Sequence, residues 1–418
     1  MDDIMKYASR MDISRMGQIM PKRMAHIMPA PAVPPRCDFP ANIAAAALHP
    51  EKQFLKVEKV IPRQSGAKTF VLVPDKEKGC ERVAPFKAGQ FISLRLRIGE
   101  SVLTRAYSIC SSPASPFYEI TVKPSEGGFA GNWICENLKA GDGVETSAPL
   151  GEFTYEPLRD APAVIAAVGG SGVTPALAMA RAVAEGLEDF SLTVLYGSTD
   201  RDNILLGDEL QAAADSCDRA RLVNVLSDDD AEGFEKGYIT AELIKKYAPA
   251  DGAYSLFICG SEQLCRFVRA ESEKLGLRRK YIREKLYNAT VGENEDDWPA
   301  ELSGKSFSLT VIRRGEAVTV PCSSTETVLC AVERSGILAA SGCRTGECGM
   351  CRAKLSAGEV YIPGRLEHRK MADMEYGFIH PCCSFPKSDI TIELASEKGA
   401  ERKGPPPMPA GPERIKHD

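Results

Sequence analysis

The sequence lacks an excess of charge of either sign. Its 418 residues carry 57 acidic and 52 basic side chains, for a formal net charge of −5. A nucleic-acid-binding protein usually shows a marked positive excess, so the composition gives no reason to expect a nucleic-acid partner. Charged residues make up 26% and apolar residues 44% of the chain. These are the fractions of an ordinary folded protein, which excludes a chain that is fibrous or disordered throughout.

The sequence also lacks a hydrophobic run that suits a membrane-spanning helix. Residues 161–180 are uncharged, but they contain three glycines and two prolines. Such a composition favours a strand, a loop and a helix in succession over one continuous helix. The N-terminus has Asp2 and Asp3 and no apolar core of the signal-peptide type. We therefore expect no membrane span and a cytoplasmic location.

Cysteine and methionine are both present in unusual patterns. The chain has 14 cysteines, and in a reducing compartment clustered cysteines indicate metal binding or catalysis more often than disulfides. Methionines are concentrated near the start, where Met16, Met20, Met24 and Met28 recur every fourth residue. On a helix this spacing forms a flexible apolar stripe. We expect the stripe either to pack on the protein's own body or to dock the chain to a larger complex.

The residue pattern predicts three domains between two appendages. Short alternating runs such as Phe91–Leu96, separated by turn residues, predict an antiparallel barrel or sandwich. Further on, apolar strands alternate with helical stretches, which predicts a parallel sheet covered by helices. The predicted ranges are 1–51 for the Met-rich extension, 52–158 for the barrel, 159–290 for the α/β domain, 291–304 for an acidic linker, 305–396 for the cysteine-rich domain and 397–418 for a disordered tail.

The clustered cysteines occur in the run SGCRTGECGMC. Cys343, Cys348 and Cys351 have the C-x₄-C-x₂-C spacing of a plant-type [2Fe–2S] cluster, which needs a fourth, distant cysteine. Zinc sites favour two C-x₂-C pairs, and this chain has one. The glycines within the run allow the backbone to approach a cluster closely and to point N–H groups at its sulfurs. The spacing leaves Cys382 and Cys383 open as the fourth ligand.

Three further motifs suit phosphate and flavin binding. Arg105-Ala-Tyr107-Ser108 ends a predicted strand. An arginine can neutralise a phosphate, a tyrosine ring can pack on a flavin, and a serine hydroxyl can hydrogen-bond near flavin N5. The glycine-rich runs 127–131 and 169–175 each precede a predicted helix. Such turns present backbone N–H groups to a phosphate at the helix N-terminus.

In this order the motifs resemble those of the ferredoxin–NADP reductase superfamily, followed by a domain similar to plant-type ferredoxins. The layout is that of iron–sulfur flavoprotein reductases of the phthalate dioxygenase reductase and phenylacetyl-CoA oxygenase reductase types. The resemblance implies an antiparallel β-barrel flavin domain, an α/β nucleotide domain with a parallel sheet, and a β-grasp-like ferredoxin domain. It implies cofactor contacts by Arg105, Tyr107, Ser108, Gly128, Gly131, Asn132, Gly169, Gly170, Gly172, Thr174, Pro175 and Gly260.

The resemblance also bears on individual positions. Plant-type ferredoxins place their last ligand four residues before a proline, which favours Cys382 as the fourth ligand with Cys343, Cys348 and Cys351. Relatives often have Ser or Thr where this chain has Gly131, which leaves FMN open beside FAD. For catalysis the resemblance implies Ser108, Cys259 beside the nicotinamide, and Glu284 near the end of the reductase module. The alternative for Cys259 is a small buried core residue.

The second strand of the α/β domain is followed by Thr199 and Asp200, where NADPH-dependent relatives commonly have an arginine. A carboxylate can accept a hydrogen bond from a ribose 2′-OH and would repel a 2′-phosphate. We therefore expect NADH, while Arg201 leaves NADPH open.

The function that the resemblance implies is electron transfer from NAD(P)H through the flavin to the [2Fe–2S] cluster. The cluster would then reduce a partner, a terminal redox protein or enzyme such as an oxygenase or reductase component. The alternative is a fixed electron-relay subunit of a larger complex with no diffusible acceptor.

Overall fold

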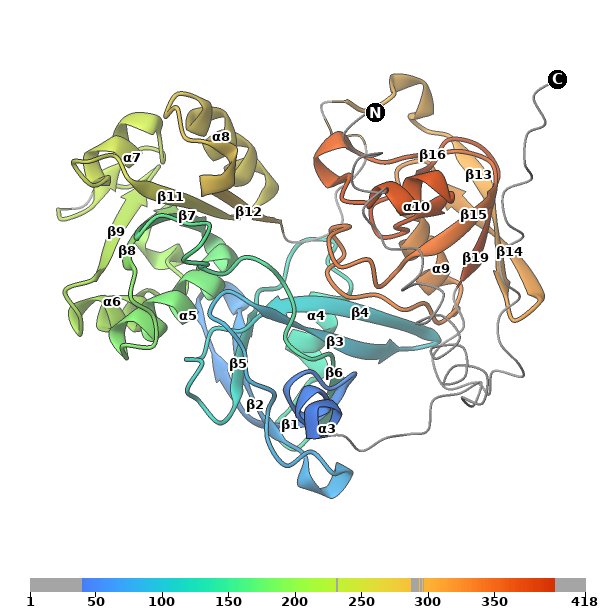
Figure 1. Ribbon diagram of the computed structural model, residues 1–418, viewed down its shortest axis with the longest axis horizontal. Coiled ribbons are helices and arrows are strands. Elements are labelled where there is room, and N and C mark those ends of the chain that lie inside the picture. The colour runs from blue at the N-terminus through green and yellow to red at the C-terminus, as the bar shows by residue number, and fades with distance from the viewer. Residues whose placement is uncertain (1–39, 231, 287–292, 294, 296, 395–418) are drawn as a thin grey trace, which may run out of the picture. The chain divides into compact units, whose positions relative to one another are not determined.

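The computed structural model describes residues 40–230, 232–286, 293, 295 and 297–394 (Figure 1). The methionine stripe and the tail from residue 397 lie outside the described residues, so the predictions for both stay predictions. Helix α3 (Pro40–Leu48) precedes the domains. The described residues from 47 to 394 belong to one compact unit, which contains three sheets of five or six strands and one two-stranded sheet.

The first sheet is antiparallel and has six strands in the order β4-β3-β6-β1-β2-β5. A bridge between Ile109 and Ile120 joins the chain after β4 to β5, so the two outer strands meet and the sheet curls into a barrel. Alternate residues such as Leu55 and Val57 are fully buried inside it. Helix α4 (Ala130–Asn137) packs on this core through Ile134. The strands are β1 (Gln53–Pro62), β2 (Lys68–Pro74), β3 (Phe91–Ile98), β4 (Ser101–Ser108), β5 (Tyr118–Val122) and β6 (Gly143–Thr146).

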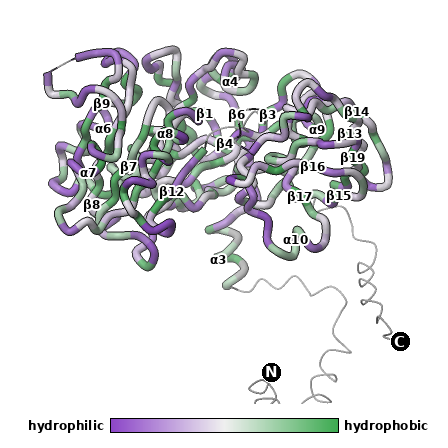
Figure 2. Tube along the Cα trace, turned by 90° about the horizontal axis from the view of Figure 1, so that it is seen from above, coloured by the Kyte–Doolittle hydropathy of each residue, from purple (hydrophilic) through white to green (hydrophobic). Residues whose placement is uncertain are grey.

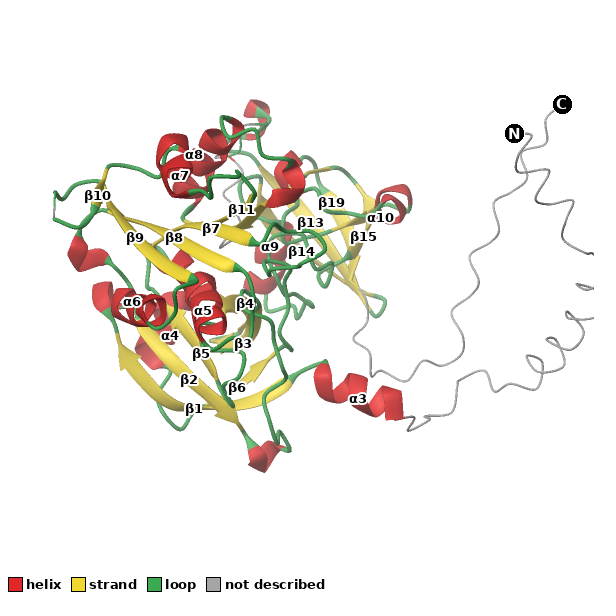
Figure 3. Cartoon of the chain, turned by 60° about the vertical axis from the view of Figure 1, so that its left-hand side comes forward, coloured by secondary structure: helices red, strands yellow, loops and turns green. Residues whose placement is uncertain are grey.

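The second sheet is parallel, with the order β10-β9-β8-β7-β11-β12. Helices α5 and α6 cover one face of this sheet, and α7 and α8 cover the other (Figure 3). Strand β7 is therefore buried on both faces, which explains why its sequence, AVIAAV, is continuously apolar. Because β8 and β11 lie on opposite sides of β7, a ligand crevice is expected at the carboxyl end of β7. The elements are β7 (Ala163–Gly169), α5 (Val173–Ala184), β8 (Ser191–Ser198), α6 (Gly207–Asp215), β9 (Ala220–Leu226), β10 (Glu235–Lys236), α7 (Ala241–Tyr247), β11 (Tyr254–Gly260), α8 (Glu262–Glu273) and β12 (Ile282–Leu286).

The third sheet is mixed and has the order β14-β13-β19-β15-β17. Strands β13 and β19 are parallel, while the other pairs are antiparallel. Helix α9 packs on this sheet through Val328, Ala331 and Val332. The elements are β13 (Ser306–Arg313), β14 (Glu316–Ser323), α9 (Val328–Arg334), β15 (Ala353–Ala357), α10 (Met371–Glu375), β17 (Phe378–Ile379) and β19 (Ile390–Leu394), with a small pair β16 (Val360–Tyr361) and β18 (Phe385–Pro386).

The fold class is therefore the one expected: an antiparallel barrel, a parallel α/β domain and a mixed-sheet C-terminal domain. The three sheets fall inside the predicted ranges 52–158, 159–290 and 305–396, whose ends stay predictions. Figure 2 shows hydrophobic and hydrophilic residues interspersed along the chain. In keeping with this, the described residues include no helix that is both long and apolar enough to span a membrane.

Candidate functional site

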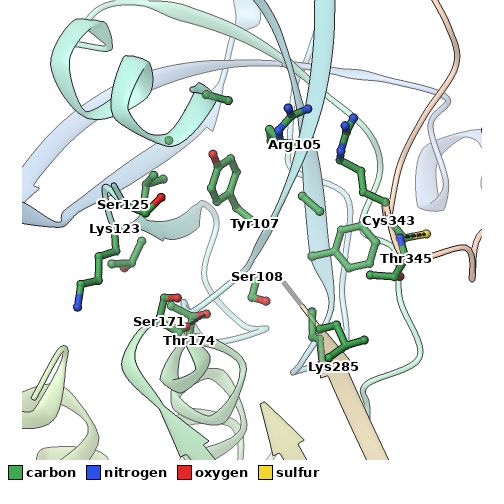
Figure 4. A pocket seen from close by; sticks show the side chains of 18 of the residues that line it. Arg105, Tyr107, Ser108, Lys123, Ser125, Ser171, Thr174, Lys285, Cys343 and Thr345 are labelled. Carbon is green, nitrogen blue, oxygen red and sulfur yellow. Dashed lines mark hydrogen bonds between the residues drawn. The ribbon is translucent and has the colours of Figure 1, made fainter. Parts of the chain in front are cut away.

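A first cavity, of about 300 Å³, lies where the barrel, the start of α5, the end of β12 and the cysteine loop meet (Figure 4). All three domains contribute side chains to it. Its lining includes Phe91, Arg105, Tyr107, Ser108, Lys123, Gly128, Gly131, Ser171, Thr174, Lys285, Cys343, Arg344, Thr345 and Glu347. The predicted flavin motif and one predicted cluster ligand thus share a single cavity.

The motif Arg105–Ser108 forms the end of β4, and its three polar side chains all line the first cavity. The Arg105 guanidinium donates to the Thr104 carbonyl at 2.8 Å and to Glu333 on α9 at 3.4 Å. Burial raises the pKa of Tyr107, so its phenol stays protonated at neutral pH. Ser108 is only 3% exposed.

The turn before α4 is shaped by Asn132. Its side chain accepts from the Ser125 N–H at 3.0 Å and donates to the Ser125 carbonyl at 2.9 Å. A Cβ at Gly128 would lie 2.5 Å from Ser125 Oγ, so this turn has no room for a side chain there. Gly128 and Gly131 line the first cavity, whereas Asn132 holds the turn and is not part of the lining.

The glycine-rich turn after β7 continues through a short 3₁₀ helix (Gly170–Gly172) into α5. A Cβ at Gly172 would lie 2.1 Å from the Cys259 carbonyl oxygen, so only glycine allows the helix to approach β11 this closely. Thr174 lines the first cavity and donates to the Ser171 carbonyl at 2.9 Å. Pro175 is in the first turn of α5 and lines neither cavity.

A second, larger cavity of about 1090 Å³ lies at the carboxyl end of the parallel sheet. Tyr238 and Phe267 line this cavity with their ring centroids 5.7 Å apart, and both residues are exposed. No local motif marks these two aromatic residues or Asp228, and sequence reasoning missed all three. The lining includes Gly169, Gly170, Ser171, Gly197, Ser198, Thr199, Asn203, Asp228, Tyr238, Gly260, Ser261, Gln263 and Phe267.

Asp200 is not part of that lining. Its carboxylate caps the 3₁₀ turn Arg201–Asn203 by accepting from the Asp202 and Asn203 backbone N–H groups, each at 3.0 Å. A hydrogen bond from the Asn203 side chain holds the pKa of Asp200 below its usual value. Arg201 donates to Asp229 at 2.9 Å and likewise lies outside the lining. The loop that follows β9 brings Asp228, rather than Asp200, to the cavity.

Cys259 and Glu284 occupy neighbouring strands, β11 and β12. Cys259 is fully buried, and Glu284 forms a two-pronged ion pair with Arg269 of α8, with one contact of 2.8 Å. Neither side chain is among those that line the two cavities. The next residue, Lys285, does line the first cavity, and sequence reasoning missed it.

The four predicted cluster ligands lie close together. Sulfur Sγ of Cys343 accepts from the backbone N–H groups of Thr345 and Cys348 at 3.4 and 3.3 Å. The Cys343 thiol also interacts with the side chains of Cys348 and Cys382. Cys351 packs in the same buried cluster as Cys382 and its neighbour Cys383. The thiol of Cys383 interacts with the Cys382 side chain and also hydrogen-bonds to the His380 carbonyl at 3.4 Å.

This donor set suits an iron–sulfur cluster. Gly346 and Gly349 have φ of +82° and +66°, which side chains rarely adopt, and a Cβ at Gly346 would lie 2.8 Å from Cys383 Sγ. Within the described residues no three His, Cys, Asp or Glu side chains gather around one metal ion. A [2Fe–2S] cluster needs no such group, because four thiolates are shared between its two irons.

Polar contacts hold the cysteine loop against the barrel. Ser93 Oγ donates to the Gly342 carbonyl at 3.1 Å, and the Thr104 and Ser341 hydroxyls hydrogen-bond to each other. Arg344 donates to the Thr104 carbonyl at 3.3 Å. The loop therefore contacts strands β3 and β4, and β4 also carries the predicted flavin motif.

Three domain families match along the chain. An oxidoreductase FAD-binding domain matches residues 77–155, an oxidoreductase NAD-binding domain residues 166–270, and a 2Fe-2S iron-sulfur cluster binding domain residues 311–387. Together with the fold and the two cavities, these matches define an NAD(P)H-dependent oxidoreductase that uses FAD and a [2Fe–2S] cluster for electron transport.

Two relatives match this chain over nearly their whole length. The chain is 28% identical over 354 residues to the glycine betaine monooxygenase reductase subunit of Chromohalobacter salexigens, covering 80% of this chain and 94% of the relative. It is 29% identical over 356 residues to the ferredoxin reductase component of 3-ketosteroid-9-alpha-monooxygenase from Mycobacterium tuberculosis, covering 82% and 96%. The solved structure of phthalate dioxygenase reductase has the same fold, with a TM-score of 0.58, 23% identity, and coverage of 82% of this chain and 98% of that one.

In its three domains and their order the chain resembles the ferredoxin–NADP reductase-like flavoproteins that carry a C-terminal [2Fe–2S] ferredoxin domain.

Proposed function

We propose that this chain is the reductase component of an oxygenase and that it takes its electrons from NADH. The observation that carries the proposal is the first cavity, which brings Tyr107 and Ser108 of the flavin motif together with Cys343 of the cysteine loop. A flavin accepts two electrons as a hydride and releases them singly, and a [2Fe–2S] cluster carries one electron at a time. The chain's own residues bind and orient these groups so that transfer takes place inside the protein.

On this proposal, Arg105 neutralises a flavin phosphate, while Tyr107 packs on the ring and Ser108 hydrogen-bonds to it. The support is that all three side chains line one cavity at the end of β4. Gly128 and Gly131 line the same cavity, where their backbone N–H groups would bind the flavin pyrophosphate. Gly169, Gly170 and Gly260 line the second cavity, at the carboxyl end of β7, where helix α5 begins and a dinucleotide phosphate is favoured.

We propose Cys343, Cys348, Cys351 and Cys382 as the cluster ligands. Their proximity and the backbone N–H groups directed at Cys343 Sγ support the assignment. Cys259 and Glu284 stay predictions as catalytic residues. The Glu284 carboxylate is paired with Arg269 of α8.

The test of the proposed function is an absorption spectrum of the protein, purified without air, before and after NADH. Flavin and iron–sulfur bands that bleach together on addition of NADH are the expected result. Iron and flavin contents, measured on the same sample, show whether the cofactors were retained. A protein that holds both cofactors and does not bleach with NADH or NADPH would rule the proposal out.

We propose that Asp228 sets the preference for NADH. Its carboxylate lines the second cavity after β9 and would repel a 2′-phosphate while accepting from a 2′-OH. In Asp228→Ser, we expect the ratio of kcat/KM for NADPH to kcat/KM for NADH to rise about tenfold. The reason is that the substitution removes the repulsion, partly screened by water, between the carboxylate and the 2′-phosphate of NADPH. In Asp200→Asn, which keeps a capping side chain, the ratio should stay near that of the wild type. If this ratio rises in Asp200→Asn and not in Asp228→Ser, Asp200 rather than Asp228 determines the preference for NADH.

The partner is proposed from the relatives. The two reductases compared above serve a glycine betaine monooxygenase and a 3-ketosteroid-9-alpha-monooxygenase. The match covers 94% and 96% of these two relatives, which supports an oxygenase component as the acceptor. No feature of the described residues favours the alternative of a fixed relay subunit.

A further inference from the structure

Lys285 is the last residue but one of β12 and lies beside Ser108 in the first cavity (Figure 4). Its Nζ donates to the Gly89 carbonyl at 3.0 Å. The same atom lies 4.9 Å from the centre of the Phe91 ring and 5.9 Å from that of Phe153. The ammonium group is thus held between a backbone carbonyl and two aromatic rings, of which Phe91 lines the cavity together with Lys285.

The positive charge of Lys285 has no close counter-charge. Within the described residues, no carboxylate lies within ion-pair distance of its Nζ. Arg105 and Arg344 line the same cavity, but both are paired with Glu333. Lys123 also lines it, on its exposed side, where water solvates the charge.

One carboxyl group acts on Lys285 electrostatically, that of Glu347, which lies in the cysteine loop and lines the same cavity. Glu347 lies beyond ion-pair distance of the Lys285 Nζ, which donates to the Gly89 carbonyl instead. Burial lowers the pKa of Lys285 to about 8, so the ammonium form still predominates at neutral pH. A charged lysine with so little compensation is costly unless a ligand supplies the opposite charge.

Hydride transfer to a flavin supplies such a charge. It delivers two electrons and one proton, so the reduced ring has one more negative charge than the oxidised ring until a second proton arrives. A cation at the wall of a low-dielectric cavity stabilises that charge more strongly than water-exposed lysines can.

We propose that Lys285 raises the reduction potential of the FAD bound in the first cavity by compensating the negative charge of its reduced form. This inference rests on the proposed function, because it needs a flavin in that cavity. Besides the residues that bind the cofactor, the site would then contain one residue that sets the cofactor's potential. A change in the flavin potential also changes the free energy of electron transfer from the flavin to the cluster.

The test is the flavin midpoint potential of the full-length protein with both cofactors bound, measured by anaerobic titration with dithionite. In Lys285→Met and Lys285→Gln we expect the equilibrium constant for flavin reduction to fall at least tenfold. For a two-electron couple this lowers the midpoint potential by about 30 mV. Lys285→Arg keeps the charge and should stay near the wild-type potential. Lys280→Met is the matched control, because Lys280 stacks on the Tyr281 ring at 4.6 Å and lines neither cavity.

Three outcomes would overturn the inference. One is an unchanged potential in both Lys285→Met and Lys285→Gln. Another is an equal fall in Lys285→Arg, which would make the side chain's packing responsible rather than its charge. The third is loss of flavin from every Lys285 variant, which would make the residue structural. If only Lys285→Met loses flavin, Lys285→Gln, which keeps a donor for Gly89, provides the measurement.

Failure of the proposed function would look different. It would appear in the wild type, as a protein with no flavin or one that NAD(P)H does not bleach. Because dithionite replaces NADH in the titration, the potentials of the variants test Lys285 independently of nucleotide binding.

Discussion

Replacing Cys382 with serine removes the [2Fe–2S] cluster, whereas replacing Cys383 with serine leaves it in place. A hydroxyl is a poor substitute for a thiolate ligand of iron. Cys382 interacts directly with Cys343, whereas Cys383 interacts with Cys382 and its thiol hydrogen-bonds to the His380 carbonyl. The two adjacent residues are equally buried, each 2% exposed, so their variants form a matched pair.

The measurements are iron content, the visible spectrum and two activities. In Cys382→Ser, reduction of ferricyanide by NADH should continue, because the flavin alone can serve it. Reduction of cytochrome c, which needs single electrons from the cluster, should fall to the background rate. In Cys383→Ser both activities should persist. If Cys383→Ser loses its iron and Cys382→Ser retains it, the assignment of the fourth ligand is reversed.

Replacing Glu333 with glutamine slows electron transfer from flavin to cluster and destabilises the protein by about 3 kcal/mol, the lower end of the range for a broken buried ion pair. Glu333 is 4% exposed and accepts from Arg344 at 2.7 Å and from Arg105 at 3.4 Å. Its carboxylate thus links the loop that carries Cys343 to the strand that carries the flavin motif. Without it, the buried guanidinium of Arg344 has no carboxylate partner among the described residues.

Stopped-flow absorption separates the two steps. The bleaching of the flavin by NADH should keep its rate in Glu333→Gln, while the appearance of the reduced cluster should be delayed. Denaturant unfolding gives the change in the free energy of unfolding. The control is Glu326→Gln on the same domain, because Glu326 pairs with the half-exposed Arg334 at 2.8 Å and should contribute about 0–1 kcal/mol. Equal behaviour of the two variants would contradict a linking role for Glu333.

Local patterns predicted much of this molecule correctly. Strand β3 is found at Phe91–Ile98, where alternation placed it, and the glycine run after AVIAAV forms the strand-to-helix turn. The residues of the flavin motif do share a cavity. These successes have one cause, because periodicity, turn residues and short spacings act over a few residues and are therefore visible in a linear chain.

Other positions could not be placed this way. Asp200 looked like a ribose ligand, but its carboxylate caps a 3₁₀ turn, and Asp228, almost thirty positions later, lines the cavity instead. Glu284 is bound to Arg269, and its neighbour Lys285 points to the cavity wall. In a strand, adjacent side chains face opposite sides, so the choice between two neighbours depends on which side the cavity lies.

The sequence by itself determined the cofactor classes, the order of the domains and the class of fold, because each depends on residues that are close together along the chain. Only the tertiary structure decided how the cofactor sites are joined. Ser93 meets Gly342, and Arg105 meets Glu333, across more than 200 positions in each case. No periodicity links such distant residues. Their meeting results from the packing of three separately recognisable domains, and it is this packing that places the flavin motif beside the cysteine loop.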